Sequence, residues 1–348
     1  MATRTPLTDT ERLDWLRLSR SENVGPISFR HLIARFGGAG AALAALPDLA
    51  RRGGRAGALK ICPKAEAERE IAALGKIGGR LIASAEPDYP LALAAIDDAP
   101  PLITVLGDAA SLHRQAVAIV GARNASANGR RLAEDIAREL GGAGYVVVSG
   151  MARGIDSAAH RGSLESGTAA VVAGGADVVY PPENDQLHRA IAERGAIVAE
   201  MPLGTEPQAR HFPRRNRLIS GLSLGVLVAE AALKSGSLIT ARLALEQGRE
   251  VFAVPGSPLD PRCRGSNNLI RQGATLAESA ADILTALAAM APAASGPKPA
   301  PRFSEQQIEI ANVSADGTTR AELESLLGPD PVAVDELDRK STRLNSSH

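Results

Sequence analysis

Glycines and arginines in one short segment of this sequence have the types and spacing needed to bind a phosphate group. Residues 149–156 read Ser-Gly-Met-Ala-Arg-Gly-Ile-Asp and follow the apolar run Val146–Val148. A glycine-bounded loop between a strand and a helix exposes backbone N–H groups and the positive helix end to an anion. Ser149, Gly150, Arg153 and Gly154 are therefore predicted to form a phosphate-binding loop.

Other basic segments are expected to share the edge of the sheet with this loop. Gly121-Ala-Arg123 ends an earlier apolar run, and residues 210–217 add Arg210, Arg214, Arg215 and Arg217 beside Asn216. Loops at the carboxyl ends of parallel strands meet at one edge, so these arginines are predicted to gather on one rim. Several planar donors in a row suit several phosphates better than one small ligand. The pattern favours a strand of nucleic acid.

Two further features are weaker indications of nucleic-acid binding. Phe212 lies among the arginines, where it could stack on a base or, equally, belong to the core. Lys234 precedes Ser235-Gly-Ser237 after another apolar run, which predicts a second helix N-terminus able to bind phosphate. Each arginine taken alone could instead be solvated or paired with an acid.

Catalysis and nucleotide cofactors are not supported by these residues. Asp156 has a sufficient local role as a helix cap, and His160 one as a packed or exposed helix residue. No Ser/His/Asp set, paired acids or metal-ligand spacing emerges, so neither a catalytic centre nor a metal site is predicted. Residues 121–129 do not match the dinucleotide fingerprint or a P-loop, so no cofactor is expected.

The composition limits the kind of binding site and the cellular compartment that are expected. The 348 residues include 39 basic and 39 acidic side chains, so a site for a polyanion has to be a local cluster. Cys62 and Cys263 are the only cysteines, which favours a reduced compartment over a disulfide framework. The sequence starts without a signal-peptide pattern and contains no apolar run of membrane-spanning length. A cytoplasmic protein without a membrane segment is therefore expected.

The elements that must position these loops alternate between strand and helix patterns. This alternation predicts an α/β fold with a doubly wound, Rossmann-like parallel sheet. The predicted strands are 117–120, 145–148, 169–173, 196–199, 226–229 and 250–254. Helices are predicted at 129–140, at 183–194 and after Ser237, and 102–107 is expected to be an edge strand that joins the sheet.

The amino-terminal region is predicted to be helical from Thr8 to about residue 73. Residues 23–37 resemble a helix-hairpin-helix with Gly25 in the turn, and the residues expected to pack its helix are Ile27, Leu32, Ile33 and Phe36. Such a hairpin either presents N–H groups to a phosphate or only packs on its neighbour. The predicted domains are 1–80 (helical), 81–290 (Rossmann-like), 291–303 (linker) and 304–348 (partial winged helix).

Six motifs in this order make the sequence resemble the DNA-processing proteins of the DprA/Smf family. They are 119–123 (Ile-Val-Gly-Ala-Arg), 149–156, 180–184 (Tyr-Pro-Pro-Glu-Asn), 212–217 (Phe-Pro-Arg-Arg-Asn-Arg), 235–240 and 248–256. The resemblance implies an extended Rossmann domain, a sterile-alpha-motif-like amino-terminal domain and a carboxyl-terminal winged helix. It further implies a non-catalytic homodimer that binds single-stranded DNA, protects incoming DNA and loads RecA in natural transformation.

The resemblance also implies which residues line the DNA site. They are Arg123, Ser149, Gly150, Arg153, Gly154, Arg214, Asn216, Arg217 and Lys234. The chain departs from the family pattern after Asp338, where no apolar period of a recognition helix follows. A Rossmann-type phosphoribohydrolase is the alternative, but its Pro-Gly-Gly-x-Gly-Thr loop is replaced by Ala-Gly-Gly-Ala-Asp at 173–177. A structural scaffold is a third, less specific possibility.

Overall fold

The computed structural model describes residues 4–52 and 59–290, which fall within one compact unit. The predicted linker and partial winged helix, at 291–303 and 304–348, lie outside these described residues. The boundary expected near residue 80 between a helical and a Rossmann-like domain stays a prediction.

The described residues contain one nine-stranded sheet in the order β1-β2-β6-β5-β4-β3-β7-β8-β9. The strands are β1 (Arg80–Ala83), β2 (Leu102–Gly107), β3 (Ala116–Val120), β4 (Val146–Ser149), β5 (Thr168–Val171), β6 (Ala196–Ala199), β7 (Gly225–Val228), β8 (Glu250–Ala253) and β9 (Thr275–Leu276). Strands β3 to β9 pair in parallel, whereas β2 pairs antiparallel with both β1 and β6. The predicted doubly wound parallel sheet is confirmed.

The strand β2 corrects one expectation, because it is not an edge strand. Residues 80–83, which were not predicted as a strand, pair with 102–105 and form the outer strand β1 themselves. On its other side β2 pairs with β6, with Thr104 opposite Ala199. The prolines lie in the connection between the two strands, which includes the short helix α5 (Leu91–Ala94).

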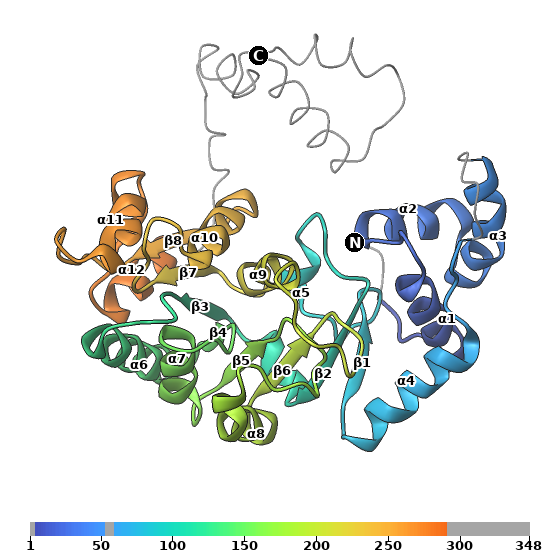
Figure 1. Cartoon of the computed structure of the whole chain (residues 1–348), viewed down its shortest axis with the longest axis horizontal. Helices are drawn as coiled ribbons and strands as arrows, with labels where there is room; N and C mark the ends of the chain where they lie inside the picture. Colours follow the sequence, from blue (N-terminus) through green and yellow to red (C-terminus); the bar gives the residue numbers. More distant parts are fainter. Residues whose placement is uncertain (1–3, 53–58, 291–348) are drawn as a thin grey trace, which may run out of the picture. The chain divides into compact units, whose positions relative to one another are not determined.

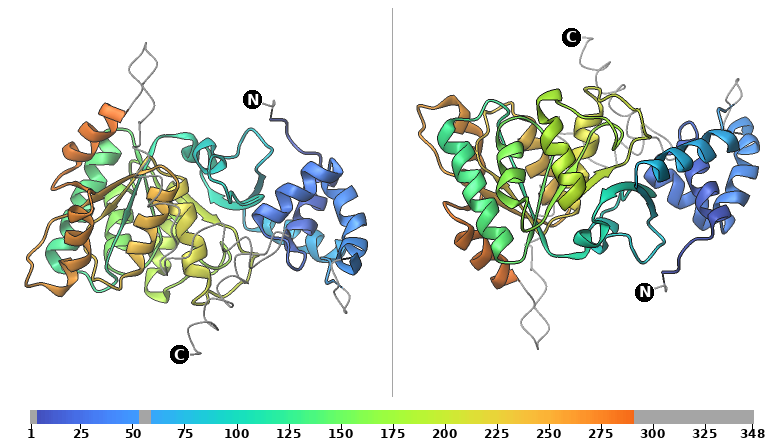
Figure 2. Two further views of the ribbon diagram at one scale, coloured as in Figure 1. Left: turned by 90° about the horizontal axis from the view of Figure 1, so that it is seen from above. Right: turned by 90° about the horizontal axis from the view of Figure 1, so that it is seen from below.

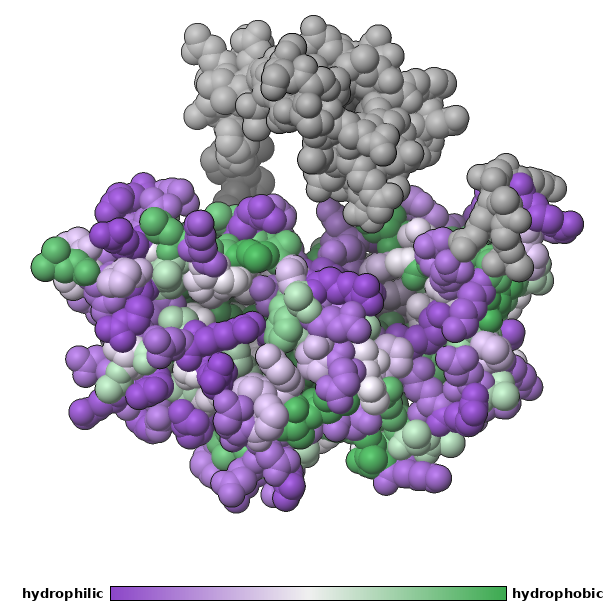
Figure 3. Space-filling view, viewed as in Figure 1, coloured by the Kyte–Doolittle hydropathy of each residue, from purple (hydrophilic) through white to green (hydrophobic). Residues whose placement is uncertain are grey.

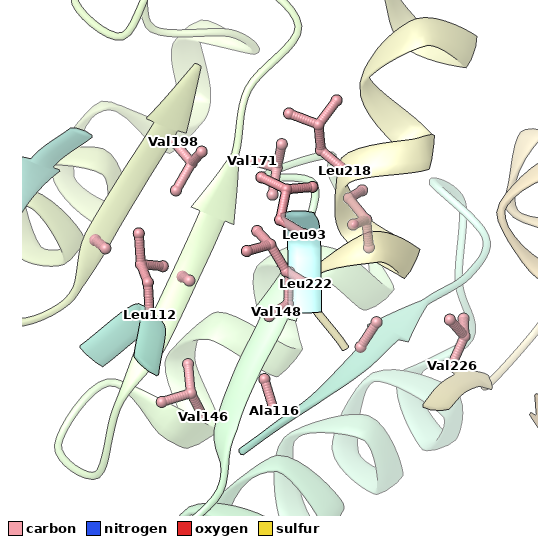
Figure 4. Close-up of a cluster of buried hydrophobic side chains, with 14 of the residues drawn as sticks. Leu93, Leu112, Ala116, Val146, Val148, Val171, Val198, Leu218, Leu222 and Val226 are labelled. Atoms are coloured by element: carbon pink, nitrogen blue, oxygen red, sulfur yellow. The ribbon is translucent and has the colours of Figure 1, made fainter. Parts of the chain in front are cut away.

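Helices cover both faces of the sheet (Figures 1 and 2). The helices of the sheet region are α6 (Ala127–Gly142), α7 (Ile155–Ser163), α8 (Asp185–Arg194), α9 (His211–Gly221), α10 (Gly236–Glu246), α11 (Arg264–Arg271) and α12 (Ala280–Met290). On one face, α5 and α9 pack Leu93, Leu218 and the C-cap residue Leu222 onto Val148 and Val171 (Figure 4), and α10 adds Ala241 and Ala244 to the same cluster. On the other, α6, α7 and α12 pack onto the alternate strand residues, such as Val117, Ile119 and Val147.

The order of the strands creates a switch point beside β3. The chain moves from β3 through β4 and β5 to β6 on one side, then returns to pair β7 with β3 and continues to β8 and β9 on the other. Crossovers that leave in opposite directions open a crevice at the carboxyl ends of the two central strands, where α/β proteins bind their ligands. Loops 121–126 and 229–235 lie at this point.

The amino-terminal helices are α1 (Asp9–Arg20), α2 (Pro26–Phe36), α3 (Ala39–Arg52) and α4 (Lys64–Lys76). A capping box between Thr8 and Glu11 begins α1. Gly25 begins α2, as the hairpin pattern predicted, but Ile27 is 52% exposed and does not pack the helix. Phe29, buried edge-on against Trp15, takes its place, and the other three predicted residues, Leu32, Ile33 and Phe36, pack against the same cluster as expected.

The surface and the helices agree with the balanced composition. Figure 3 shows hydrophilic side chains over most of the face in view, with hydrophobic ones in separate patches between them. Within residues 4–52 and 59–290, each helix by itself is too short or too polar to cross a membrane. The pair α2 and α3 reaches the required length and apolarity only together, across a bend of 105°.

Candidate nucleic-acid interface

A groove with a volume of about 830 Å³ lies at the carboxyl edge of the sheet. Its walls come from the loops after β3, β4 and β7, from α9 and α10, and from the segment before α11. The walls include Arg123, Asn124, Tyr180, Phe212, Asn216, Lys234 and Arg262. A pocket of about 40 Å³ opens beside it, sharing Arg123, Tyr180 and Phe212 and adding Gly150 and Arg153. The groove therefore forms at the switch point, as the topology dictates.

Two aromatic rings, tilted by 59° to each other, and an arginine form a platform in the groove wall. The guanidinium carbon of Arg123 lies 5.0 Å from the ring centroid of Phe212. The Phe212 ring lies 5.6 Å from that of Tyr180, and Tyr180 is 44% exposed. Half-exposed rings beside a planar cation offer stacking surfaces to an unpaired base. Of the two interpretations of Phe212, the structure favours the groove over the core.

Tyr180 was missed by residue-level reasoning, although it lies in a motif that carried the resemblance. Asn184, at the end of that motif, explains how the tyrosine reaches Phe212. Its Nδ2 donates hydrogen bonds to the carbonyl of Met151 (2.7 Å) and to Ser157 Oγ (3.0 Å). Asn184 thus fastens the segment 180–184 to the loop after β4.

The loop after β4 needs both of its glycines. A Cβ on Gly150 would lie 1.8 Å from an Nη atom of Arg215, so a larger residue would displace that guanidinium. Gly154 has a φ of +82° and approaches the carbonyl of Ala122 so closely that a Cβ would lie 2.2 Å from it. Arg153, between them, has a 64% exposed side chain, with a 3.4 Å ion pair to Glu183. The loop is fixed by its glycines and presents its cation outward.

Asp156 is not the helix cap that the sequence suggested. Helix α7 begins at Ile155, with Gly154 before it, so Asp156 falls in the first turn. Its carboxylate accepts a hydrogen bond from the backbone N–H of Ala152 (3.2 Å). Burial raises the pKa of Asp156 to about 6, against the opposing effects of Arg215 and of the loop N–H groups. Asp156 therefore holds the loop and balances a buried cation.

That cation, Arg215, lies under the platform instead of on the rim. It is buried, and its Nη1 donates to the carbonyl of Val171 (2.8 Å). Burial lowers the pKa of Arg215 to about 10, while Asp156 acts to raise it. Its Nε finds no acceptor among residues 4–52 and 59–290. Nearby His160 is buried against Thr168, and burial lowers its pKa to about 3, so it is a neutral packed residue at pH 7.

Helix α9 divides the predicted basic cluster between two faces. Phe212, Arg215 and Asn216 face the groove, whereas Arg214 and Arg217 turn to the buried carboxylate of Glu200. Arg214 Nη2 lies 2.9 Å from Glu200, and Arg217 Nη2 lies 2.7 Å from both of its oxygens. Asn216 Nδ2 donates to the carbonyl of Gly236 (3.3 Å), which ties α9 to α10.

The remaining predicted residues have separate positions. Ser149 is fully buried, and its hydroxyl donates to the carbonyl of Ile119 (2.6 Å), so it joins β4 to β3. Lys234 is exposed in the groove wall beside the N-terminus of α10, where Ser235 caps the helix. Five of the nine predicted residues thus line the groove or its side pocket: Arg123, Gly150, Arg153, Asn216 and Lys234.

Metal chemistry has no obvious donors in this region. Across the described part of the chain, no three His, Cys, Asp or Glu side chains group in a way that could hold a metal ion. The polar and aromatic side chains in the groove are mostly cations, aromatic rings, amides and hydroxyls, with the buried Asp156 as its acidic group. Their chemistry is that of binding phosphates and bases.

Comparison with known proteins points to the same chemistry. The family model described as "DNA recombination-mediator protein A" matches residues 80–288, and the "DprA-like N-terminal HHH domain" matches residues 9–73. The DNA processing protein DprA of Bacillus subtilis is 45% identical over 222 residues, 63% of this chain and 75% of that protein. Protein Smf of Escherichia coli is 43% identical over 64% of this chain, which spans only 60% of that relative.

Solved structures resemble the chain as well. The crystal structure of DprA from Streptococcus pneumoniae has a TM-score of 0.66 and 34% identity, covering 80% of this chain and 98% of that one. DNA processing protein A from Helicobacter pylori, solved to describe its single-stranded DNA binding mode, has a TM-score of 0.56 and 29% identity. That match covers 61% of this chain and 96% of the other.

Proposed function

The chain belongs to the family of DNA recombination-mediator protein A, and from this premise we propose that its groove binds single-stranded DNA. The observation that carries the proposal is the platform of Arg123, Phe212 and Tyr180 in a groove that also presents Lys234. Bases of a single strand can leave their neighbours and stack on aromatic rings, while arginine and lysine bind the phosphates between them. Duplex bases are stacked and paired already, so the site selects the single strand.

The proposed contacts follow from the position of each residue. Arg123, Arg153 and Lys234 bind phosphates, Gly150 offers its loop to the backbone, and Asn216 lines the groove floor. Four of the predicted residues act indirectly in this proposal, by holding the walls in place: Ser149, Gly154, Arg214 and Arg217. Only the first group lines the groove or its side pocket.

The wider role proposed here rests on the family and its resemblance. The protein acts as a non-catalytic mediator that protects incoming single-stranded DNA and loads RecA onto it during natural transformation. It works as a homodimer in the cytoplasm. The description of the family model as a recombination mediator supports this role.

Fluorescence anisotropy of labelled oligonucleotides tests the binding proposal. A single-stranded homopolymer, the matching duplex and a mononucleotide are titrated at several salt concentrations. We expect the single strand to bind most tightly, with log K falling by about 2 per decade of salt for three neutralised phosphates. Affinity independent of salt, or equal affinity for the mononucleotide, would favour a nucleotide-processing enzyme and refute the proposal.

A filament assay tests the role as a mediator. RecA is added to single-stranded DNA already coated with a single-strand-binding protein, with and without the present chain, and filament growth is followed by RecA ATPase activity. We expect this chain to shorten the lag. If the lag is unchanged while DNA binding is intact, the chain binds DNA but does not load RecA.

A further inference from the structure

The loop between β8 and α11 forms a wall of the groove, and its residue Arg262 lies beyond the motif at 248–256. Strand β8 pairs with β7 on the side away from β3, so its carboxyl end extends the switch-point edge by one strand. Arg262 follows this strand and lines the same groove as Arg123 and Lys234. The basic wall of the groove therefore extends beyond the residues that the motifs indicate.

Hydrogen bonds to its neighbours hold this loop in place. Asn267 of α11 donates from Nδ2 to the carbonyl of Gly256 (2.8 Å) and accepts from the N–H of Gly256 (3.0 Å). The N–H of Gly265 donates to the carbonyl of Ala231 (2.7 Å), three residues before Lys234. Both ends of the loop are thus attached, one to α11 and the other to the segment that carries Lys234.

Asp260 orients the guanidinium of Arg262. The carboxylate accepts from Nε at 3.0 Å and from Nη2 at 2.7 Å, and also from the backbone N–H of Arg262 at 2.9 Å. This carboxylate raises the pKa of Arg262, and the guanidinium in turn lowers the pKa of Asp260. A guanidinium has five N–H donors, and Asp260 engages the Nε and Nη2 edge. The Nη1 group is the part left to bind an anion, and the side chain is 42% exposed.

We propose that Arg262 binds a backbone phosphate at the β8 end of the groove, so that a single strand crosses the sheet edge from β4 to β8. The proposal rests on single-stranded DNA binding in the groove and assigns the strand its path. Three steps between adjacent strands separate β4 from β8, which is about 14 Å. A strand on this path presents several successive phosphates to the groove. A mononucleotide cannot span this distance.

The matched pair Arg262→Ala and Arg264→Ala tests this path. Arg264 lies two residues further on, is exposed and is outside the groove lining, so both variants remove one charge from the same region. For a long homopolymer we expect Arg262→Ala to weaken binding about tenfold and to reduce the salt slope by about 0.7. Arg264→Ala is expected to stay within about twofold of the parent protein.

A second test varies the length of the oligonucleotide. A mononucleotide that occupies the aromatic platform does not reach Arg262, so its affinity should be equal in Arg262→Ala and the parent protein. The variant Arg262→Lys keeps the charge and should recover most of the salt slope. Equal losses in Arg262→Ala and Arg264→Ala, or an equal loss for the mononucleotide and the long strand, would overturn the proposed path.

The controls separate this inference from the proposed function. If the parent protein fails to bind single strands, the proposed function itself is wrong. If the parent binds and Arg123→Ala weakens binding while Arg262→Ala does not, only the path to β8 is wrong. Thermal unfolding of each variant shows whether a loss of binding comes from a loss of folded protein.

Discussion

At the scale of single residues, Phe212 is the side chain whose role the structure clarified most. Its ring contacts a cation on one side and Tyr180 on another, and it lies in the wall of an open groove. An aromatic residue kept only for the core would instead pack among aliphatic side chains. This position makes stacking, and not burial, the property to test.

Replacing Phe212 by Ala should weaken single-stranded DNA binding by about 1–3 kcal/mol, the usual value of one base–aromatic stack. Phe212→Tyr keeps the ring and serves as the control, with affinity close to that of the parent. Anisotropy with a labelled homopolymer measures both. If Phe212→Ala binds as tightly as Phe212→Tyr, the ring does not stack on a base.

Asp156 predicts a pH dependence of stability. Burial raises its pKa from the ordinary value of 3.8 to about 6, so the native state binds this proton more tightly than the unfolded state does. The contribution of this group to stability therefore falls as pH rises from about 4 to about 6, and is constant above that range. Urea unfolding of the parent and of Asp156→Asn across this range measures it. The Asn variant should lose this component of the slope, and an unchanged slope would show that Asp156 is ionised throughout.

At the scale of elements, α9 shows how one helix distributes one basic motif. Residues 212, 215 and 216 face the groove, and 214 and 217 face Glu200, as a helix with 3.6 residues per turn requires. Glu200 follows β6, and its backbone carbonyl also accepts a hydrogen bond from Arg20 of α1 (3.1 Å). The carboxylate thus fixes the helix that carries Phe212, without contacting the groove.

Removing this carboxylate should be costly. In Glu200→Gln the buried guanidinium of Arg217 loses its buried counter-charge and keeps only its 3.3 Å ion pair with the more exposed Asp98, and breaking a buried pair typically costs about 3–5 kcal/mol. Glu183→Gln is the matched control, because its ion pair with Arg153 is exposed and worth about 0–1 kcal/mol. Urea unfolding compares the two free energies. Equal effects would mean that Glu200 does not hold α9 in place.

At the scale of the whole molecule, the groove is a product of the strand order. Loops that are distant in sequence, at 121–126, 150–154 and 229–235, meet because β4, β3 and β7 are neighbours in the sheet. Helices on both faces bury the strands, so the loops at the carboxyl edge are the parts left to bind a ligand. The amino-terminal helices join this unit through Leu16 and Ala67, which pack against Ala83 of β1 and Leu102 of β2.

Local patterns in the sequence were enough to predict the alternation of strands and helices and the cationic residues that follow the strand ends. Apolar β-branched runs place β3, β4 and β7, and Arg123, Arg153 and Lys234 lie in the loops that follow these strands, at the carboxyl edge. These conclusions need only local patterns, because the period of a strand and the position of a turn depend on neighbouring residues.

The partner of each buried or half-buried side chain was visible only once the sheet was assembled. That Arg215 faces Asp156, that Arg217 faces Glu200 and that Tyr180 lies beside Phe212 depends on segments brought together by the sheet order. Helical periodicity divides α9 into faces, but it does not say which face meets the groove. The same reason hid the edge strand β1 and the groove position of Arg262: both depend on long-range contacts, which local sequence patterns do not encode.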